Sequence, residues 1–385
     1  MKILFIQDSL GTGGAERSNA HLWYYLRDKG VELKIAVLEH RKVGIEEEIL
    51  KAGFDVHFVK EKDFFNQSKE IAGLIREFSP DLVHTVLFKA TLRTRFAKLF
   101  TSFVHIESLV NCTYDTVRLT DSRISKKAFY FYKYLDNITG KLFTDKFIPI
   151  TKVVHDHYQN ELGIHPNKMN VIYRGRQENQ LIQSKEKLKD KVGKELGIPE
   201  DNIIITHVGR QEFQKGHLVL LKAIESLNAN DKSKVSFLFF GREGNVSEDI
   251  KSFLNANILG ADIHWMGHRN DVAKFLAVTD IFVFPSFYEG LGGSLIEAQA
   301  AALPIICTDI PVLNEVVDKD GNALLFKKND HLELSDKLSH LINNEKLRAE
   351  MGKKSLQRFR SKFKIEDIHQ EVFSYYQEII DSSRR

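Results

Sequence analysis

The sequence has little cysteine, little proline and no long apolar run. Its 385 residues contain two cysteines, Cys112 and Cys307, and seven prolines. Two cysteines exclude a disulfide framework and suit a reducing compartment. No apolar stretch approaches the roughly 20 residues that cross a bilayer, and the apolar run after Lys2 is too short for a secretory signal. We therefore expect a cytoplasmic protein, with a peripheral position on the inner face of the membrane left open.

The charge has no strong sign either, since the formal net charge is +3. A balance this even gives no reason to expect a nucleic-acid partner. The charge is unevenly placed, however, because residues 87–146 hold eleven Lys and Arg against five Asp and Glu. No Cys/His cluster has the spacing of a zinc site. The only D-x-D pattern, at Asp318 and Asp320, lies in a polar stretch that we interpret as a turn.

Short apolar runs alternate with segments of helical period, as is typical of parallel sheets with crossover helices. In the first half, the expected strands are 2–7, 31–38, 54–59, 81–86, 102–106 and 146–150, and the expected helices are 15–29, 66–79 and 89–101. In the second half, the expected strands are 202–208, 234–240, 262–266, 280–284 and 304–308, and the expected helices are 216–229, 270–277 and 292–302. The pattern predicts an α/β protein with two Rossmann-like, doubly wound domains.

The domain boundary is expected in a polar, highly charged stretch without a strand signal. We place the first domain at 1–173, a linker region at 174–200 and the second domain at 201–365. The residues from 332 onward look wholly helical, and the last helix, 366–385, could pack back on the first domain. Ligands of such sheets bind beyond the carboxyl ends of the strands, so two domains facing each other would form a central cleft.

The stretch "SLGTGGAERS" joins the first strand to the first helix. Gly13 and Gly14 allow close approach of the backbone to a ligand, and the helix start directs N–H groups at an anion. A dinucleotide fingerprint would need a third glycine where Glu16 stands, although Glu39 could serve as its acidic residue. A nicotinamide oxidoreductase is therefore a weak alternative, and a tight turn without a ligand is another.

The stretch "THVGRQEFQKGH" follows a strand in the second half. The strand ends at Gly209, and Arg210 and Lys215 flank a short loop before the next helix. An arginine fork and a lysine point charge both suit phosphate oxygens, so these residues could bind a diphosphate. The alternative is that both are solvated surface cations.

The stretch "FPSFYEGLGGSLIEAQAAALP" carries two carboxylates eight residues apart, Glu289 and Glu297. Carboxylates at a strand end can accept hydrogen bonds from vicinal hydroxyls. Gly290, Gly292 and Gly293 leave backbone amides bare at a helix start that favours a phosphate. Hydroxyls together with a diphosphate describe a nucleotide sugar. The alternative is that both carboxylates only complement the helix dipole.

The order of these motifs resembles that of retaining glycosyltransferases of the two-domain B-type fold, most closely glycosyltransferase family 4 (glycosyl transferases group 1). The similarity begins with "GGAERS" and "DLVHTV" and is strongest from "HVGRQEFQKG" through "FFGREG", "GHRNDV" and the E-x7-E pattern that ends at Glu297. Each motif alone is unspecific, but their order over roughly 300 residues is specific.

The resemblance implies a role for each matching residue. Arg210 and Lys215 would contact the donor diphosphate, Glu297 the ribose hydroxyls and Glu289 the hydroxyls of the transferred sugar. The remaining donor contacts implied are backbone groups near Gly209, Arg269, Gly290, Leu291, Gly292 and Gly293 in the second domain, and Gly13 and Gly14 in the first. The first domain would take the acceptor, and no metal ion or other cofactor would be required.

The sequence departs from the family in three places. The family commonly has a catalytic histidine after the fifth strand, where this chain has "FVHIESLVN". His105 is the candidate, although it could lie inside the strand, with Glu107 or Ser108 in its place. Ala302 replaces a common glycine in "AAALP", and Arg242 stands in "FGREG" where a small acidic residue is usual.

The segment 123–146 mixes Arg123 and several lysines with six aromatic residues. With the basic helix expected at 89–101, it could lie on an anionic membrane surface, which would suit a lipid-linked acceptor. The alternatives are a packed helix with a solvated basic face and a nucleic-acid contact, which no known recognition motif accompanies.

The resemblance thus predicts transfer, with retention, of a hexose or N-acetylhexosamine from a UDP- or GDP-linked sugar. The acceptor would be a glycan or a lipid-linked glycan of a surface polysaccharide or glycolipid pathway. The alternative outside the enzymes is a catalytically weak partner subunit that binds nucleotide sugars.

Overall fold

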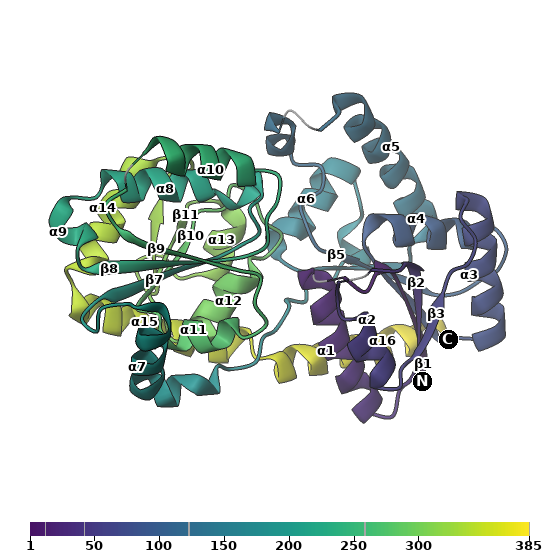
Figure 1. Ribbon diagram of the computed structural model, residues 1–385. Helices are drawn as coiled ribbons and strands as arrows, with labels where there is room; N and C mark the ends of the chain where they lie inside the picture. Colours follow the sequence, from purple (N-terminus) through teal and green to yellow (C-terminus); the bar gives the residue numbers. More distant parts are fainter. Residues whose placement is uncertain (12, 42, 122–123, 258, 385) are drawn as a thin grey trace. The chain divides into compact units, whose positions relative to one another are not determined.

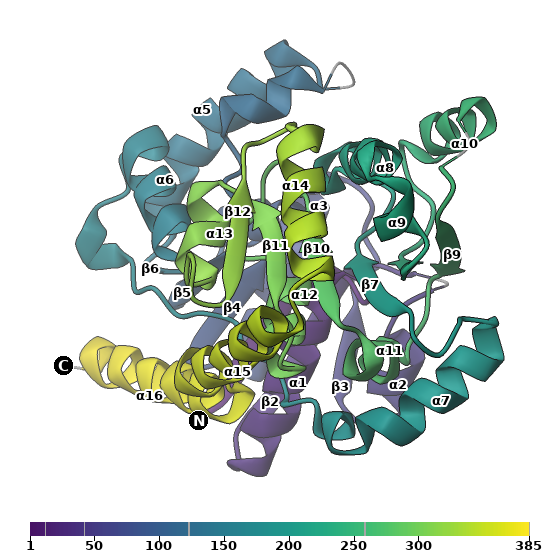
Figure 2. The same cartoon turned by 90° about the vertical axis from the view of Figure 1, so that its left-hand side faces the viewer.

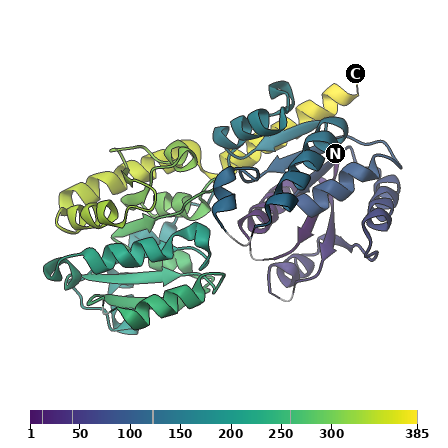
Figure 3. The ribbon, with the colours of Figure 1, turned by 90° about the horizontal axis from the view of Figure 1, so that it is seen from above.

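The computed structural model describes residues 1–11, 13–41, 43–121, 124–257 and 259–384. They form two compact units, Met1–Arg174 with Glu366–Arg385, and Gly175–Ile365. Each unit contains a six-stranded parallel sheet (Figure 1) with helices on both of its faces (Figure 3). The predicted fold class, with two doubly wound α/β domains, is confirmed.

The sheet of the first unit has the order β3-β2-β1-β4-β5-β6. Its strands are β1 (Lys2–Ser9), β2 (Glu32–Glu39), β3 (Asp55–Phe58), β4 (Leu82–Val86), β5 (His105–Leu109) and β6 (Lys146–Pro149). β1 and β4 are neighbours, with Ile3 opposite Leu82, although β2 and β3 lie between them in sequence. The strand order therefore reverses between β1 and β4, and ligands of open α/β sheets bind at such a switch point.

Helices and short 3-10 turns connect these strands. They are α1 (Gly14–Asp28), α2 (Glu46–Lys51), α3 (Phe64–Phe78), α4 (Phe88–Ala97), η1 (Thr116–Thr120), α5 (Lys126–Phe143), α6 (Lys152–Leu162) and η2 (Pro166–Lys168). The last helix of the chain, α16 (Ile365–Ser383), also belongs here, because Val372 and Tyr376 are buried in the same core cluster as Trp23. Tyr376 also forms a 2.5 Å hydrogen bond between its hydroxyl and Nδ1 of His84 on β4.

The sheet of the second unit has the order β12-β11-β10-β7-β8-β9. In Figure 2 the labels of β12, β11, β10, β7 and β9 follow one another from left to right in this order. Its strands are β7 (Ile203–Val208), β8 (Val235–Phe240), β9 (Asp262–Gly267), β10 (Ile281–Phe284), β11 (Ile305–Thr308) and β12 (Ala323–Phe326). The chain adds β8 and β9 on one side of β7 and returns to place β10 on the other side. The switch point of this sheet therefore lies between β7 and β10.

The helices of the second unit cover both faces of its sheet. They are η3 (Gln180–Ser184), α7 (Lys185–Leu196), η4 (Phe213–Lys215), α8 (His217–Ser226), α9 (Ala229–Lys232), α10 (Ser247–Ala256), α11 (Val272–Val278), α12 (Gly293–Ala300), α13 (Pro311–Val316), α14 (His331–Ile342) and α15 (Glu345–Lys362). The stretch 174–200, which we expected to be a linker region, contains α7. Val192 of α7 is buried in one cluster with Ile204 and Phe275.

Two strands differ from the sequence analysis. β5 begins at His105 and ends at Leu109, three residues later than the strand expected at 102–106. Its polar residues Glu107 and Ser108 are buried because they pair with Arg95 and His84. A pattern of apolar residues therefore does not predict the second half of this strand. β12 was not expected, because its four residues follow directly on a turn and give almost no periodicity.

Candidate functional site

The candidate site of the second unit lies at the switch point of its sheet. β7 and β10 pair in parallel, with Ile205 opposite Ile281, so their carboxyl ends lie at the same edge. The loops that follow them, 209–216 and 285–292, are the two stretches that the sequence analysis singled out. Residues 74 positions apart in sequence therefore meet at one edge of the sheet.

Hydrogen bonds and an aromatic contact join the two loops. The amide of Phe287 donates to the Gln214 carbonyl at 2.8 Å, and Nε2 of Gln214 donates to the Tyr288 carbonyl at 2.6 Å. The rings of Phe213 and Phe287 pack with centroids 5.0 Å apart. Gly216 has φ of +66°, and a Cβ there would lie 2.1 Å from the Pro285 carbonyl oxygen. Only glycine allows this close approach.

Lys215 and Glu289 form an ion pair between the two loops. Nζ of Lys215 lies 2.5 Å from Oε1 of Glu289, and both side chains are mostly buried. The same ammonium lies 5.3 Å from the centre of the Phe284 ring, at the end of β10. A carboxylate and an ammonium held in a partly dehydrated place interact more strongly than on the open surface. The predicted residues Lys215 and Glu289 are thus brought together.

Glu297 lies on α12, eight residues after Glu289 in the E-x7-E pattern. Its Oε1 accepts a 2.9 Å hydrogen bond from Nε of Arg176, and 40% of its side chain is exposed. Arg176 was missed by the sequence analysis, because it lies in the stretch taken as a linker, 121 residues before its partner. It orients Glu297 and leaves a large part of the carboxylate accessible.

The start of α12 provides backbone amides at the same edge of the sheet. Gly292 caps the helix with φ of +83°, where a side chain would be strained. Gly293 begins the helix, and its first N–H groups have no partner within the helix. Gly290 and Leu291 precede it and are buried. A helix start of this kind favours an anionic ligand.

The two other predicted cations differ in their surroundings. The Arg210 side chain is 53% exposed, and its Nη1 lies 3.9 Å from Oε1 of Glu212. Arg210 follows Gly209, the first residue after β7. Arg269 follows β9, two strands away from β7, and its guanidinium pairs with Asp271 at 2.7 Å. Arg210 is therefore accessible on the loop that carries Lys215, whereas the side chain of Arg269 is engaged locally.

In the first unit, the glycine loop lies at the switch point between β1 and β4. Gly13 caps α1, and Gly14 begins it. The Glu16 carboxylate folds back toward the loop, since a Cβ on Gly13 would lie 2.3 Å from its Oε2. The space beside Gly14 is open, with no atom within 4 Å of a Cβ built there. An anion at this helix start would have to displace the Glu16 carboxylate.

Asp8 is a further candidate that the sequence analysis did not name. It lies at the carboxyl end of β1, directly before the glycine loop, and accepts a 2.7 Å hydrogen bond from the Ala90 amide. Burial raises the pKa of Asp8 to about 6, against the lowering effects of that amide and of Lys89. A carboxyl group with such a pKa at a switch point is typical of functional sites. The signal in the sequence was an acidic residue at a strand end before "SLGTGG".

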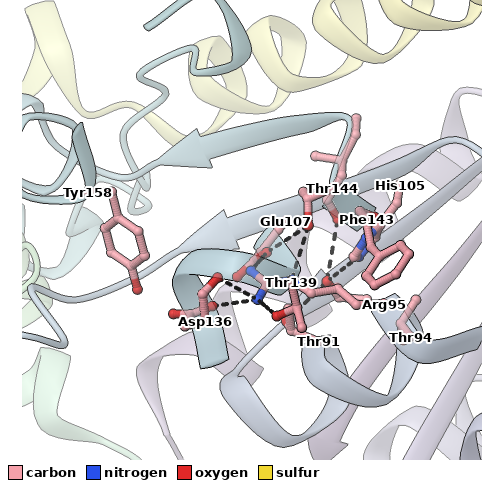
Figure 4. A network of polar contacts seen from close by, with 12 residues as sticks. Thr91, Thr94, Arg95, His105, Glu107, Asp136, Thr139, Phe143, Thr144 and Tyr158 are labelled. Atoms are coloured by element: carbon pink, nitrogen blue, oxygen red, sulfur yellow. Dashed lines mark hydrogen bonds and ion pairs between the residues drawn. The ribbon is translucent and has the colours of Figure 1, made fainter. Parts of the chain in front are cut away.

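His105 is placed away from the carboxyl end of its strand. It begins β5, its side chain is fully buried, and Nε2 lies 2.8 Å from the Thr85 hydroxyl while Nδ1 donates to the Phe143 carbonyl at 3.1 Å. Burial holds the pKa of His105 well below its usual value. These surroundings give the imidazole no access to a ligand, so we interpret His105 as structural. Figure 4 shows it beside a buried polar network.

The network in Figure 4 also contains Glu107, one of the alternatives to His105. Oε2 of Glu107 accepts from Nη2 of Arg95 on α4 at 2.5 Å, and Nη1 of Arg95 donates to Asp136 on α5 at 2.5 Å. Burial raises the pKa of Glu107 to about 7, opposed by Arg95. Ser108, the other alternative, is bonded to Nε2 of His84 at 2.8 Å. Glu107 thus connects β5 to α4, and Ser108 connects β5 to β4, so we interpret both residues as structural.

The two basic segments also differ. In α4, which occupies most of 89–101, the side chain of Arg95 is almost completely buried. In α5 the lysines are on the surface together with aromatic residues. Arg123 lies outside the described residues.

Among the residues that the structure describes, no three His, Cys, Asp or Glu side chains gather where they could hold a metal ion. No helix in the described ranges is both long and apolar enough to cross a bilayer.

Comparison with known proteins agrees with the order of the motifs. Residues 12–179 match the family profile "Glycosyltransferase Family 4", and residues 189–358 match "Glycosyl transferases group 1". An uncharacterized glycosyltransferase of Methanocaldococcus jannaschii is 30% identical over 69% of this chain and 68% of its own length. The N,N'-diacetylbacillosaminyl-diphospho-undecaprenol alpha-1,3-N-acetylgalactosaminyltransferase of Campylobacter jejuni is 27% identical over 86% of this chain and 82% of its own.

Among solved structures, Anabaena HepE in complex with UDP is similar to this chain with a TM-score of 0.84. The match covers 98% of this chain and 100% of HepE, at 18% sequence identity. It extends the agreement in fold over both units.

Proposed function

Because the chain belongs to the glycosyltransferases of group 1 and family 4, we propose that it transfers a hexose or N-acetylhexosamine from a UDP- or GDP-linked sugar, with retention of configuration. The acceptor is a glycan or a lipid-linked glycan of a surface polysaccharide or glycolipid pathway. The observation that carries this proposal is the Lys215–Glu289 pair at the switch point, with Glu297 on the helix that follows.

In this proposal the donor binds at the carboxyl ends of β7 and β10. Arg210 and Lys215 bind the diphosphate, and the amides of Leu291, Gly292 and Gly293 add to its binding from the start of α12. Glu297, oriented by Arg176, accepts hydrogen bonds from the ribose hydroxyls. Glu289 accepts hydrogen bonds from hydroxyls of the transferred sugar. The backbone near Arg269 lies beside the base.

Cleavage of the bond between the sugar and the diphosphate leaves negative charge on the departing phosphate. Lys215, Arg210 and the start of α12 stabilise that charge where it develops. We propose that no metal ion is required, because these groups supply the positive charge. The departing phosphate then takes the proton of the acceptor hydroxyl on the same face of the sugar.

The first unit is proposed to take the acceptor. As the resemblance implies, Gly13 and Gly14 at its switch point belong to the donor-binding residues, and an anion there requires the Glu16 carboxylate to move. The names of two similar proteins support the proposed acceptor and donor classes. The Campylobacter relative is named for a diphospho-undecaprenol substrate, and HepE was solved with UDP. A lipid-linked acceptor would place the enzyme at the inner face of the membrane.

The proposal is tested by incubating the purified protein with radiolabelled UDP-glucose, UDP-galactose, UDP-N-acetylglucosamine or GDP-mannose and a bacterial lipid extract. We expect label from one donor to enter the lipid fraction, with EDTA present, and the product to keep the anomeric configuration of the donor by NMR. Glu289→Gln is the matched inactive variant. Transfer that needs added Mg²⁺ would contradict the metal-free mechanism, and absence of transfer from every donor would favour the non-catalytic partner subunit.

A further inference from the structure

The outer face of α5 is apolar, although it faces solvent. The side chains of Phe131, Tyr134 and Leu142 are 61%, 69% and 68% exposed, and Ile138 is 38% exposed. At 100° per residue these four residues fall within an arc of about 80°. We call them the α5 stripe. A helix of a water-soluble fold normally turns such a stripe to the core, and exposed apolar patches of this kind mark interaction sites.

The orientation of α5 is fixed by the buried network on its other face (Figure 4). Nη1 of Arg95 donates to Asp136 at 2.5 Å and to the Thr139 hydroxyl at 2.9 Å, and both acceptors are on α5. The Tyr114 hydroxyl donates to the second oxygen of Asp136 at 2.7 Å. A buried charge of this kind cannot leave its partners without a large cost. Rotation of α5 that would bury the stripe is therefore prevented.

The exposed charges of α5 are all positive. Lys126, Lys127 and Lys141 are exposed, and Lys133 pairs with Glu161 on α6. The only acidic residue of the helix is Asp136, which is buried in the network. Lys127 continues the line of the stripe one turn before Phe131. In Figures 1 and 2, α5 lies along the upper edge of its unit.

We propose that the α5 stripe and its lysines dock the protein on an anionic lipid bilayer. Apolar and aromatic side chains in one line, flanked by lysines, suit a helix that lies in the interface plane. A second copy of the chain fits less well, because a symmetric contact through α5 would place lysines against lysines. The biological role of this docking rests on the proposed function, because docking would bring the enzyme to a lipid-linked acceptor. Binding of the α5 stripe to lipid needs neither donor nor acceptor.

The test is flotation of the full chain with vesicles, without nucleotide or acceptor. The vesicles are phosphatidylcholine alone, or phosphatidylcholine and phosphatidylglycerol in equal parts. We expect binding to the anionic vesicles only, and weaker binding at high salt. Phe131→Ser/Tyr134→Ser/Leu142→Ser should lower the partition coefficient at least tenfold. Lys126→Glu/Lys127→Glu should lower it by more than about 25-fold, since each lysine near an anionic surface contributes about fivefold and each new glutamate is also repelled.

Matched controls change the same residue types elsewhere. Leu50→Ser/Leu181→Ser/Leu332→Ser alters three exposed apolar side chains on other elements, and Lys353→Glu/Lys354→Glu makes the same charge change on α15. Both should bind vesicles as the wild type does. Circular dichroism and the shift of the melting temperature with UDP show that each variant is folded and binds a donor.

The outcomes separate this inference from the proposed function. Wild-type protein that stays with the aqueous phase, or a stripe variant that floats as well as the wild type, overturns the inference even where UDP still stabilises the protein. A dimer on gel filtration that the stripe variant dissociates would identify a second copy as the occupant instead. Vesicle binding without any effect of UDP or GDP would keep the inference and count against the proposed donor.

Discussion

Nζ of Lys215 and Oε1 of Glu289 lie 2.5 Å apart, although 74 residues separate them in the chain. They come from the loops that follow β7 and β10. These strands are neighbours in the sheet, although β8 and β9 lie between them in sequence. The second unit therefore holds a mostly buried ammonium and a mostly buried carboxylate next to each other. Phosphate and sugar hydroxyls are the two parts of a nucleotide sugar that need these groups.

Replacement of one partner should destabilise the protein more than replacement of both. Glu289→Gln leaves the Lys215 ammonium without its carboxylate in a mostly buried place, and we expect a loss of about 3 kcal/mol in the free energy of unfolding. Lys215→Met/Glu289→Gln should recover most of that loss. Denaturant unfolding measures the free energy of unfolding of the single and double variants. A loss in the double variant that equals the sum of the losses in Lys215→Met and Glu289→Gln would show that the pair is not coupled.

Recovery of stability should not restore activity. Lys215→Met should lower the turnover number by about 100- to 1000-fold, because a preorganised group that stabilises developing charge is lost. The stabilised double variant should remain as inactive. Turnover is measured with the donor that the radiolabel transfer assay selects, and a double variant with near wild-type turnover would remove both residues from the proposed mechanism.

Glu297→Gln should weaken donor binding about tenfold, because hydrogen bonds to a carboxylate become hydrogen bonds to a neutral amide. The Kd of UDP, measured by calorimetry, is the readout. Glu248→Gln is the matched control, since its side chain is 85% exposed on α10. An unchanged Kd for Glu297→Gln would place the ribose elsewhere.

The stability of the first unit should depend on the ionisation of Asp8. Burial raises the pKa of Asp8 from 3.8 to about 6, so the folded state binds this proton more tightly than the unfolded state. The stabilisation is present below about pH 4 and is lost as the pH rises through about 6. Asp8→Asn keeps an oxygen for the Ala90 amide and cannot ionise.

Relative to wild type, Asp8→Asn should therefore gain up to about 3 kcal/mol of stability between about pH 4 and pH 7. Denaturant unfolding across this range measures the difference. The control is Asp28→Asn, at an exposed position of α1. A difference that does not change with pH would show that Asp8 is not perturbed.

Ala302 occupies the position where the family commonly has glycine, and its φ is +56°. A side chain is strained in this left-handed conformation. Ala302→Gly should therefore stabilise the second unit by about 0.5–1 kcal/mol. Ala301→Gly, at φ of −93°, should destabilise it by a similar amount. Thermal unfolding that shows the opposite order would contradict the strain at Ala302.

The sequence predicts the parts of the site that lie within one loop, and not the contacts between loops. Glu289 and Glu297 are visible as a spaced pair, because a single strand-to-helix connection carries both. The pairing of Arg176 with Glu297 is not visible, since it depends on where a polar stretch far upstream packs. For His105 the sequence predicts a site residue that the structure does not support. Only the strand register shows that His105 begins β5 and is buried.

Helical periodicity also predicts more of the core than of the surface. It gives α5 as a helix, but it assigns apolar residues to the core by default. The outward direction of the stripe follows from the partners of Arg95, which come from separate elements of the first unit. The return of α16 to the first unit likewise depends on a distant contact, that of Tyr376 with His84.

The most direct test of the account is the binding of nucleotides to the purified chain. The melting temperature should be measured with UDP, GDP, ADP, CMP and NAD, first with EDTA and then with Mg²⁺. A ligand that binds only the folded state raises the melting temperature by mass action. We expect a shift with UDP or GDP that needs no metal and is reduced in Lys215→Met and Glu297→Gln. A shift with NAD alone, or one that both variants retain in full, would contradict it.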